Sequence, residues 1–345
     1  MIEGHGDDIY RYGDLVKMNF SSNIFQHVDH SALKAHLTEH LDLINNYPEP
    51  RPRQLETLIA RKEGISPEGV MVTNGASEAI YLIAHLFHHS ASIIPQPTCC
   101  EYAEACRMFD HIISYENTEE LTSLPADRVY WICNPNNPSG NVLMKGFVDY
   151  IVRRSPRYTF VIDQSYDCCT REPLLVAREM KGLPNLFIIH SLSKTYSIPG
   201  LRLGYITADP SLINLLRGLY RPWSVNALAI EAGRFLIEHG TPAVTDLDAY
   251  LEETERLRQS LRRIGIRVFE TKTNYMLCEI SQTTAAKLKD YLIHEHGILI
   301  RDCSNFYGLS SHFFRVSTQL PEENDALVEA IRMFLERKDA NNLQE

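Results

Sequence analysis

The sequence lacks long hydrophobic runs, and it lacks an excess of basic charge. No apolar segment approaches the roughly 18 residues that a transmembrane helix needs. Lys and Arg together number 34 against 44 for Asp and Glu, which leaves a formal net charge of −10 over 345 residues. A chain of this charge without clustered basic residues binds phosphate backbones and anionic membranes poorly. We therefore expect neither a nucleic-acid partner nor a membrane partner.

Several small motifs are also missing. The eight cysteines include no C-x-x-C spacing, which argues against a zinc ribbon and against a disulfide framework. Gly4 and Gly6 lack the third glycine of a dinucleotide-binding loop, so a nicotinamide dehydrogenase is disfavoured. Residues 1–8 contain no signal-peptide pattern, and we expect a cytoplasmic protein with reduced thiols.

Histidines are the remaining candidates for metal ligands. Helical or near-helical spacing occurs at His85, His88, His89, His294 and His296. No cysteine or carboxylate cluster accompanies them, and exposed histidines of this kind are common without a metal. The sequence therefore predicts no metal site.

What the chain does contain is an alternation of short apolar runs with helical patterns. The runs of strand length are 70–72, 92–94, 129–133, 158–162, 186–189 and 203–206. This alternation predicts a large α/β domain over residues 51–222, built on a doubly wound, mostly parallel sheet. Long helical patterns with a few short strands predict a smaller α+β domain over 223–345. Residues 1–50 are predicted to form an N-terminal arm that contributes to the small domain.

Polar residues follow four of the predicted strands, at the sheet edge where open α/β sheets bind their ligands. These segments are Gly75-Ala76-Ser77, Asn134-Pro135-Asn136-Asn137-Pro138, Asp163-Gln164-Ser165-Tyr166 and Ser191-Leu192-Ser193-Lys194. They offer an anion site at a helix N-terminus, an amide, a carboxylate with a phenol, and a lysine flanked by hydroxyls. Pyridoxal phosphate needs a lysine amine, an acidic partner for its ring nitrogen and a phosphate site. The sequence therefore predicts pyridoxal 5'-phosphate as the cofactor.

The most specific motif lies between residues 191 and 205. It reads Ser-Leu-Ser-Lys at 191–194 and Gly-Leu-Arg-Leu-Gly-Tyr at 200–205. Together with the upstream Asn-Pro-Asn-Asn-Pro-Ser-Gly and Asp-Gln-Ser-Tyr runs, it resembles the lysine signature of the class I/II aminotransferases. The resemblance covers nearly the whole chain. It implies the aminotransferase-like fold type I of pyridoxal phosphate enzymes.

The resemblance also implies a role for each matching residue. Lys194 would attach the cofactor and move the proton at the substrate Cα, while Asp163 would pair with the ring nitrogen. Asn137 and Tyr166 would hydrogen-bond the ring oxygen, so the expected catalytic residues are Lys194, Asp163 and Tyr166. The cofactor phosphate would be held by Ala76, Ser77, Ser191, Ser193, Arg202 and Tyr47. In the family this tyrosine comes from the neighbouring subunit, which implies a homodimer with the N-terminal arm at the dimer contact.

One position departs from the family pattern. After Pro97 and Thr98 the family has an aromatic residue that stacks on the pyridine ring, whereas this chain has Cys99. Tyr102 lies one helical turn further on. The sequence leaves the stacking partner of the ring open.

Two arginines indicate the substrate. By the same resemblance, Arg315 clamps a carboxylate or phosphate, and Arg301 is typical of members that act on phosphorylated substrates. Two arginines that face one small ligand imply two anionic groups or one dianion. Asn137, together with Asn23 and His5 of the arm, completes the expected substrate-binding set.

Two branches of the family share these features. Residues 5–11, 19–24, 222–229 and 298–309 resemble the threonine-phosphate decarboxylases of cobalamin biosynthesis. Residues 315–317 and 321–324 read equally like the histidinol-phosphate aminotransferases of histidine biosynthesis, which transaminate with 2-oxoglutarate. We favour the decarboxylase because the match of the arm is the more particular, and we keep the aminotransferase as the alternative. A non-catalytic sensor with this fold is disfavoured, since no helix-turn-helix segment is present and Lys194 and Asp163 both are.

Overall fold

The computed structural model describes residues 7–115 and 128–342, and the contacts divide the chain into two compact units. The large unit comprises His27–Asn136 and Val142–Thr245. The small unit comprises Met1–Gln26, Asn137–Asn141 and Asp246–Glu345. Each unit has its own sheet and its own buried core, and each is described by itself below.

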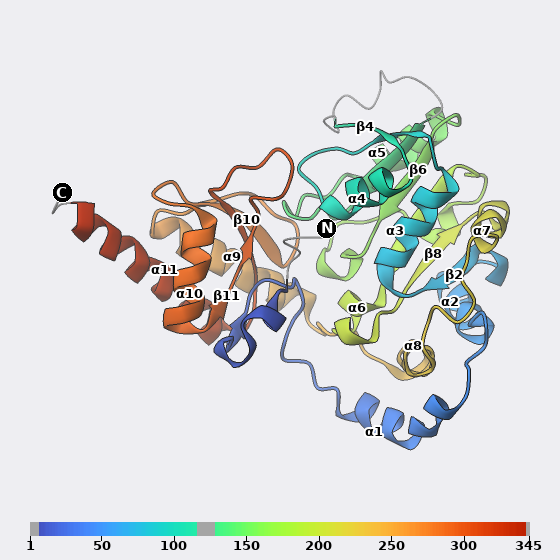
Figure 1. Cartoon of the computed structure of the whole chain (residues 1–345), viewed down its shortest axis with the longest axis horizontal. Coiled ribbons are helices and arrows are strands. Elements are labelled where there is room, and N and C mark those ends of the chain that lie inside the picture. The colour runs from blue at the N-terminus through green and yellow to red at the C-terminus, as the bar shows by residue number, and fades with distance from the viewer. Residues whose placement is uncertain (1–6, 116–127, 343–345) are drawn as a thin grey trace. The chain divides into compact units, whose positions relative to one another are not determined.

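The large unit is built on a seven-stranded sheet in the order β2-β8-β7-β6-β5-β3-β4 (Figure 1). Strand β8 runs antiparallel to both of its neighbours, and the other pairs are parallel. The strands are β2 (Val70–Thr73), β3 (Ala91–Ile93), β4 (Ile112–Ser114), β5 (Arg128–Cys133), β6 (Thr159–Asp163), β7 (Leu186–Ser191) and β8 (Gly204–Ala208). The predicted α/β fold with a mostly parallel sheet is confirmed.

Helices cover both faces of this sheet. They are α1 (Ser31–Glu39), α2 (Arg53–Glu63), α3 (Gly75–Leu86), α4 (Cys100–Met108), α5 (Lys145–Arg154), α6 (Leu192–Thr195), α7 (Pro210–Arg217) and α8 (Ala227–His239). Successive strand residues point to opposite faces, so Val161 joins the core under α3 and α4, whereas Phe160 and Ile162 join the core under α5. Burial on both faces explains why the strands read as continuous apolar runs.

The small unit contains a four-stranded antiparallel sheet in the order β12-β13-β10-β9 and a separate parallel pair, β1 with β11. The strands are β1 (Met18–Asn19), β9 (Arg267–Val268), β10 (Tyr275–Glu279), β11 (Ile298–Leu299), β12 (Arg301–Asp302) and β13 (Phe313–Ser317). The helices α9 (Leu247–Arg263), α10 (Ala285–His296) and α11 (Pro321–Asn342) supply buried leucines and isoleucines to the core of this unit. This is the α+β architecture that the C-terminal sequence predicts.

The units divide the chain at different places from the boundaries expected at residues 50 and 222. Residues 27–50 and 223–245 belong to the large unit, because α8 packs against both α1 and α2. Helix α1 lies in the arm, where the sequence shows no strong period. Residues 137–141 belong to the small unit, where the N–H of Lys272 donates to the carbonyl of Gly140 at 2.9 Å.

Among the helices of residues 7–115 and 128–342, none is both long enough and apolar enough to cross a membrane.

Candidate functional site

Asp163 ends β6 at the carboxyl edge of the sheet, in the position expected from the sequence. The residue is only 6% exposed. Its Oδ1 accepts a hydrogen bond of 2.8 Å from the N–H of Ser165, and its Oδ2 accepts one of 2.7 Å from the phenol of Tyr102. Its neighbours on the adjoining strands are Cys133 and Ile189. The carboxylate is therefore held by two donors in the middle of the sheet.

Tyr102 is the residue of this site whose role the sequence did not reveal. Its ring is buried, and the ring centroid lies 5.8 Å from that of Trp131. Burial, followed by the negative charge of Asp163, raises the pKa of the phenol well above its usual value. The hydroxyl therefore keeps its proton and donates a hydrogen bond to the carboxylate. Tyr102 therefore holds the Asp163 carboxylate in place at the edge of the sheet.

Cys99 stands where the family has its stacking aromatic residue. Its side chain is half-buried and packs against the same core as Ala76. The neighbouring thiol of Cys100, together with burial, raises the pKa of Cys99 well above its usual value. Cys99 therefore offers a neutral thiol, and no aromatic ring, at this position.

Lys194 lies in α6, the four-residue helix that follows β7. Its side chain is half-buried, and Nζ lies 5.8 Å from the centre of the Tyr166 ring. The flanking Ser191 and Ser193 are both buried. Among the described residues, the hydroxyl of Ser193 has no hydrogen-bond partner. A buried hydroxyl without a partner is costly, so it points to a polar group that this site is built to receive.

The first turn of α3 offers backbone N–H groups that suit an anion. Gly75, Ala76 and Ser77 begin this 12-residue helix, whose first N–H groups have no acceptor within the helix. Gly75 has φ +76°, and a Cβ added there would lie 2.5 Å from Nη2 of Arg202. The guanidinium therefore lies directly against the helix start. Gly204 of β8 also lies close to the start of α3, since a Cβ added there would lie 2.8 Å from the backbone nitrogen of Ala76.

These features fit a phosphorylated cofactor with a basic ring nitrogen. The helix start and the Arg202 guanidinium suit a phosphate, and the unpaired Ser193 hydroxyl adds a donor. The buried Asp163 carboxylate suits a protonated ring nitrogen. The half-buried amine of Lys194 suits covalent attachment.

The small unit holds a pair of buried arginines. Arg301 on β12 and Arg315 on β13 are direct partners across the antiparallel ladder, and they are 5% and 3% exposed. Arg315 donates to Oδ1 of Asn137 and to the carbonyl of Ser21. Arg301 donates to Oδ1 of Asn305 at 2.8 Å. Like charges that face each other in a buried ladder repel, so this pair is suited to an anionic ligand.

The N-terminal residues that the sequence places at the site differ in their exposure to solvent. Asn23 is 1% exposed with φ +55°, and neither polar atom of its side chain has a hydrogen-bond partner among the described residues. That is the state expected of an amide that meets a ligand. Tyr47 is 86% exposed, and its ring lies 5.5 Å from that of Trp223. His5 lies outside the described residues.

Residues 16–331 match the sequence profile of the family described as Aminotransferase class I and II. The crystal structure of L-threonine-O-3-phosphate decarboxylase from Porphyromonas gingivalis is similar at 36% identity, with a TM-score of 0.89 over 92% of this chain and 99% of that one.

Two curated relatives extend the comparison. Threonine-phosphate decarboxylase of Salmonella typhimurium is 27% identical, covering 92% of this chain and 91% of its own length. Histidinol-phosphate aminotransferase 1 of Mannheimia succiniciproducens is 28% identical, covering 94% of this chain and 91% of its own length. The relatives therefore come from the two branches that the sequence motifs indicate.

Proposed function

The chain belongs to the family of class I and II aminotransferases, and we propose that it releases carbon dioxide from threonine phosphate. The observation that carries this proposal is the buried pair of Arg301 and Arg315 on adjacent strands. Threonine phosphate has a carboxylate and a phosphate on one short skeleton, and it can therefore occupy two guanidinium groups at once. Similarity to a threonine-phosphate decarboxylase at 36% identity supports the same substrate.

The enzyme uses pyridoxal phosphate, which when bound supplies an electron sink for negative charge at the substrate Cα. We propose that Asp163 holds the ring-nitrogen proton, with the Tyr102 phenol keeping the carboxylate in place at 2.7 Å. Tyr166 and Asn137 would hold the ring oxygen through hydrogen bonds. The amine of Lys194 would hold the cofactor and would move the proton at the substrate Cα.

The cofactor phosphate is assigned to the groups around the start of α3. The N–H groups of Ala76 and Ser77 point out of the first turn of a helix whose N-terminus carries partial positive charge. Arg202 adds a full charge beside Gly75. Ser191 and Ser193 contribute hydroxyls from the buried end of β7 and the start of α6.

The choice between the two reactions depends on which substrate bond is broken. A decarboxylase breaks the bond from Cα to the carboxylate, whereas an aminotransferase removes the proton of Cα. Histidinol phosphate has no carboxylate, so it uses the arginine pair through its phosphate alone. It also needs a slot for its imidazole ring. The similarity to histidinol-phosphate aminotransferase 1 at 28% identity keeps transamination as the second candidate.

The substrate is tested by assaying both reactions with one preparation. We expect carbon dioxide release from threonine phosphate to exceed transamination of histidinol phosphate with 2-oxoglutarate by at least tenfold in kcat/KM. Arg315→Lys retains the charge but loses the bidentate fork, and we expect it to lower kcat/KM for threonine phosphate by about 10- to 100-fold. Efficient turnover of histidinol phosphate, without carbon dioxide from threonine phosphate, would instead establish the second candidate.

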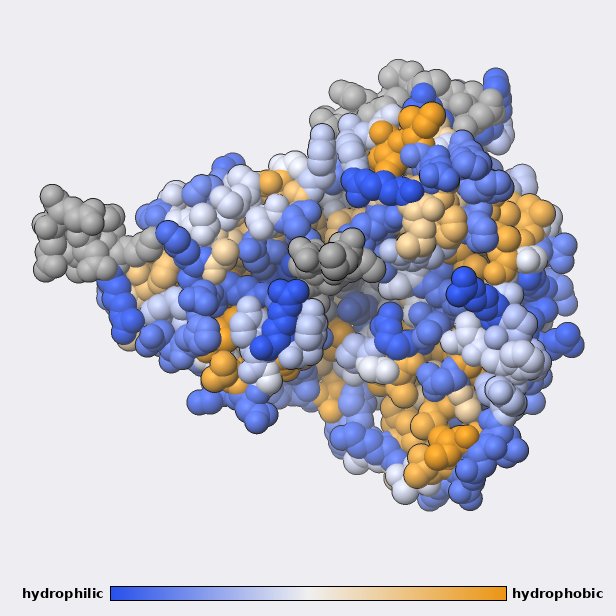
Figure 2. Space-filling view, viewed as in Figure 1, coloured by the Kyte–Doolittle hydropathy of each residue, from blue (hydrophilic) through white to orange (hydrophobic). Residues whose placement is uncertain are grey.

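A homodimer is the assembly that the exposed segment after α1 supports. Leu41, Ile44 and Tyr47 expose 50%, 63% and 86% of their surfaces, and Trp223 beside Tyr47 exposes 49%. Figure 2 shows hydrophobic surface gathered at the lower edge of the view, where Figure 1 places α1 and the segment after it. Clustered apolar exposure of this kind marks an interaction surface. We infer that a second copy covers it and receives Tyr47 at its cofactor phosphate.

Subunit mixing tests this assembly. The inactive protein that carries both Lys194→Ala and Arg202→Ala is mixed with the weakly active Tyr47→Phe protein. One of the two sites in a mixed dimer is then intact if Tyr47 crosses to the partner while Arg202 stays. We expect activity to return to at most about a quarter of the wild-type value, because about half of the dimers are mixed. A monomer at micromolar concentration in sedimentation, or no recovery from verified mixed dimers, would contradict the inference.

We also propose a cytoplasmic location. All eight cysteines are free thiols, including the adjacent pair Cys168 and Cys169, whose sulfur atoms lie 3.6 Å apart. Free thiols in this number are typical of proteins that work in a reducing compartment.

A further inference from the structure

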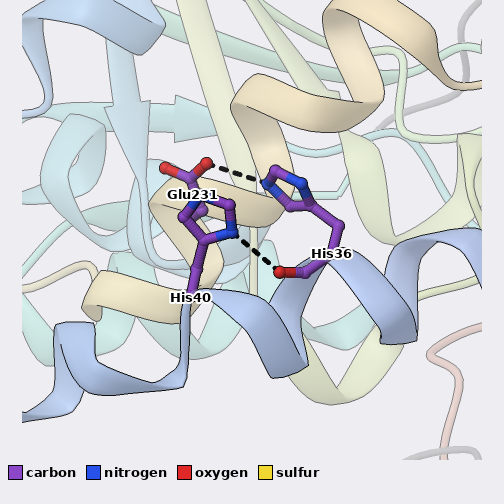
Figure 3. A group of neighbouring side chains, drawn as sticks. All are labelled: His36, His40 and Glu231. Atoms are coloured by element: carbon purple, nitrogen blue, oxygen red, sulfur yellow. Dashed lines mark hydrogen bonds and ion pairs between the residues drawn. The ribbon is translucent and has the colours of Figure 1, made fainter.

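Two histidines and a glutamate gather where α1 and α8 of the large unit pack together. His36 lies in α1, His40 follows the last turn of that helix, and Glu231 lies in α8. One potential ligand atom from each residue lies within 4.8 Å of the other two. Figure 3 shows the three side chains converging from the two helices. The sequence predicts no metal site. Glu231 is 191 positions from His40, and the packing of α8 on α1 brings the two together.

Each of the three side chains is held by a second contact. Nδ1 of His40 lies 2.8 Å from the carbonyl oxygen of His36, which can only accept a hydrogen bond. Nδ1 therefore carries the proton, and Nε2 of a neutral His40 presents a lone pair. The ring of His36 stacks on Phe235 with centroids 4.4 Å apart. Outer contacts that set the tautomer and orient the ring are typical of histidines that bind metals.

The carboxylate is oriented in the same way. Glu231 is 8% exposed, and its Oε2 accepts a hydrogen bond of 3.0 Å from Nη1 of Arg234. Its Oε1 lies 2.9 Å from Nε2 of His36. The centroids of the two imidazole rings lie 4.2 Å apart, so the three side chains form one compact cluster.

We propose that His36, His40 and Glu231 bind a divalent transition-metal ion of the zinc type. Two imidazoles and one carboxylate are a ligand set that Zn²⁺ accepts, with water in the fourth position. Bonds of about 2.0–2.1 Å in a tetrahedron place ligand atoms roughly 3.3 Å apart, so a modest contraction of the cluster closes the site. The ion would join α1 to α8 and stabilise the segment that carries Tyr47. This inference does not rest on the proposed reaction.

Zinc binding is tested on the full chain loaded with pyridoxal phosphate, after removal of free cofactor and of any affinity tag. Zn²⁺ alone is titrated against a chromophoric chelator. We expect one ion per chain in the wild type, and binding at least tenfold weaker in His40→Ala and in Glu231→Gln. His85→Ala is the matched control, because His85 also stacks on a phenylalanine, with centroids 4.5 Å apart at Phe109. It should bind zinc like the wild type.

Two further measurements distinguish zinc bound by His36, His40 and Glu231 from zinc bound by cysteine thiolates. Zinc should raise the Tm of the wild type by about 3 °C and leave that of folded His40→Ala unchanged. Co²⁺ should produce weak visible bands without the intense near-ultraviolet absorption that thiolate ligands cause. The proposal is overturned if the wild type takes up no zinc, if both His40→Ala and Glu231→Gln bind it as tightly as the wild type, or if the cobalt spectrum shows thiolate ligation at the cysteines.

Discussion

Lys194→Ala is expected to lower kcat by at least about 10³-fold, while the folded protein still takes up pyridoxal phosphate without covalent attachment. The amine of Lys194 is half-buried above Tyr166, with Nζ 5.8 Å from the ring centre, and it follows two buried serines. In our proposal the same amine attaches the cofactor and carries the proton at Cα. Its removal therefore eliminates two functions at once, which explains the size of the expected loss.

The measurement is borohydride reduction followed by peptide mapping, with kcat determined in parallel. Reduction of the wild type should fix the cofactor on Lys194, and the variant should show no fixed adduct. Lys62→Ala is the matched control, because Nζ of Lys62 lies 5.7 Å from the ring centre of Tyr196 in a comparable contact. Its kcat should stay near the wild-type value. A reduced adduct on another lysine, or no uptake of the cofactor by the wild type, would refute the assignment.

Asp163→Asn is expected to retain the cofactor and to lower kcat by about 10²- to 10⁴-fold. The amide still accepts the hydrogen bond that Ser165 donates to Oδ1 at 2.8 Å, so the local structure is preserved. An amide cannot hold the proton of the ring nitrogen, however, and the electron sink weakens. The measurement is kcat at saturating substrate together with the cofactor content of the purified variant.

Tyr102→Phe tests a smaller change at the same carboxylate. It removes one hydrogen bond of 2.7 Å to the Asp163 carboxylate and leaves the negative charge in place, so we expect a smaller fall in kcat, about tenfold. Tyr205→Phe is the matched control, since its buried phenol donates to the Glu63 carboxylate at the same distance of 2.7 Å. It should leave kcat unchanged. Near-normal turnover in Asp163→Asn would show that another group holds the ring nitrogen.

The sequence by itself determined the features that depend on local order along the chain. Strands buried on both faces must be apolar throughout, so the runs that became β5 and β7 were visible as such. Residues at the carboxyl ends of parallel strands share one edge, which predicted that Asp163 and Lys194 would lie at the same edge of the sheet. The lysine motif is contiguous, and its interpretation needed no contact between distant residues.

Only the tertiary structure decided the features that depend on contacts between distant residues. The pairing of Tyr102 with Asp163 spans 61 positions, and its geometry arises from packing of α4 under the sheet. The direct alignment of Arg301 with Arg315 is a matter of strand register, which sequence spacing does not specify. The place of residues 27–50 in the large unit, and the meeting of His40 with Glu231, likewise follow from how α8 packs on α1. Side-chain packing across elements decided these features, and no periodic pattern in the sequence encodes it.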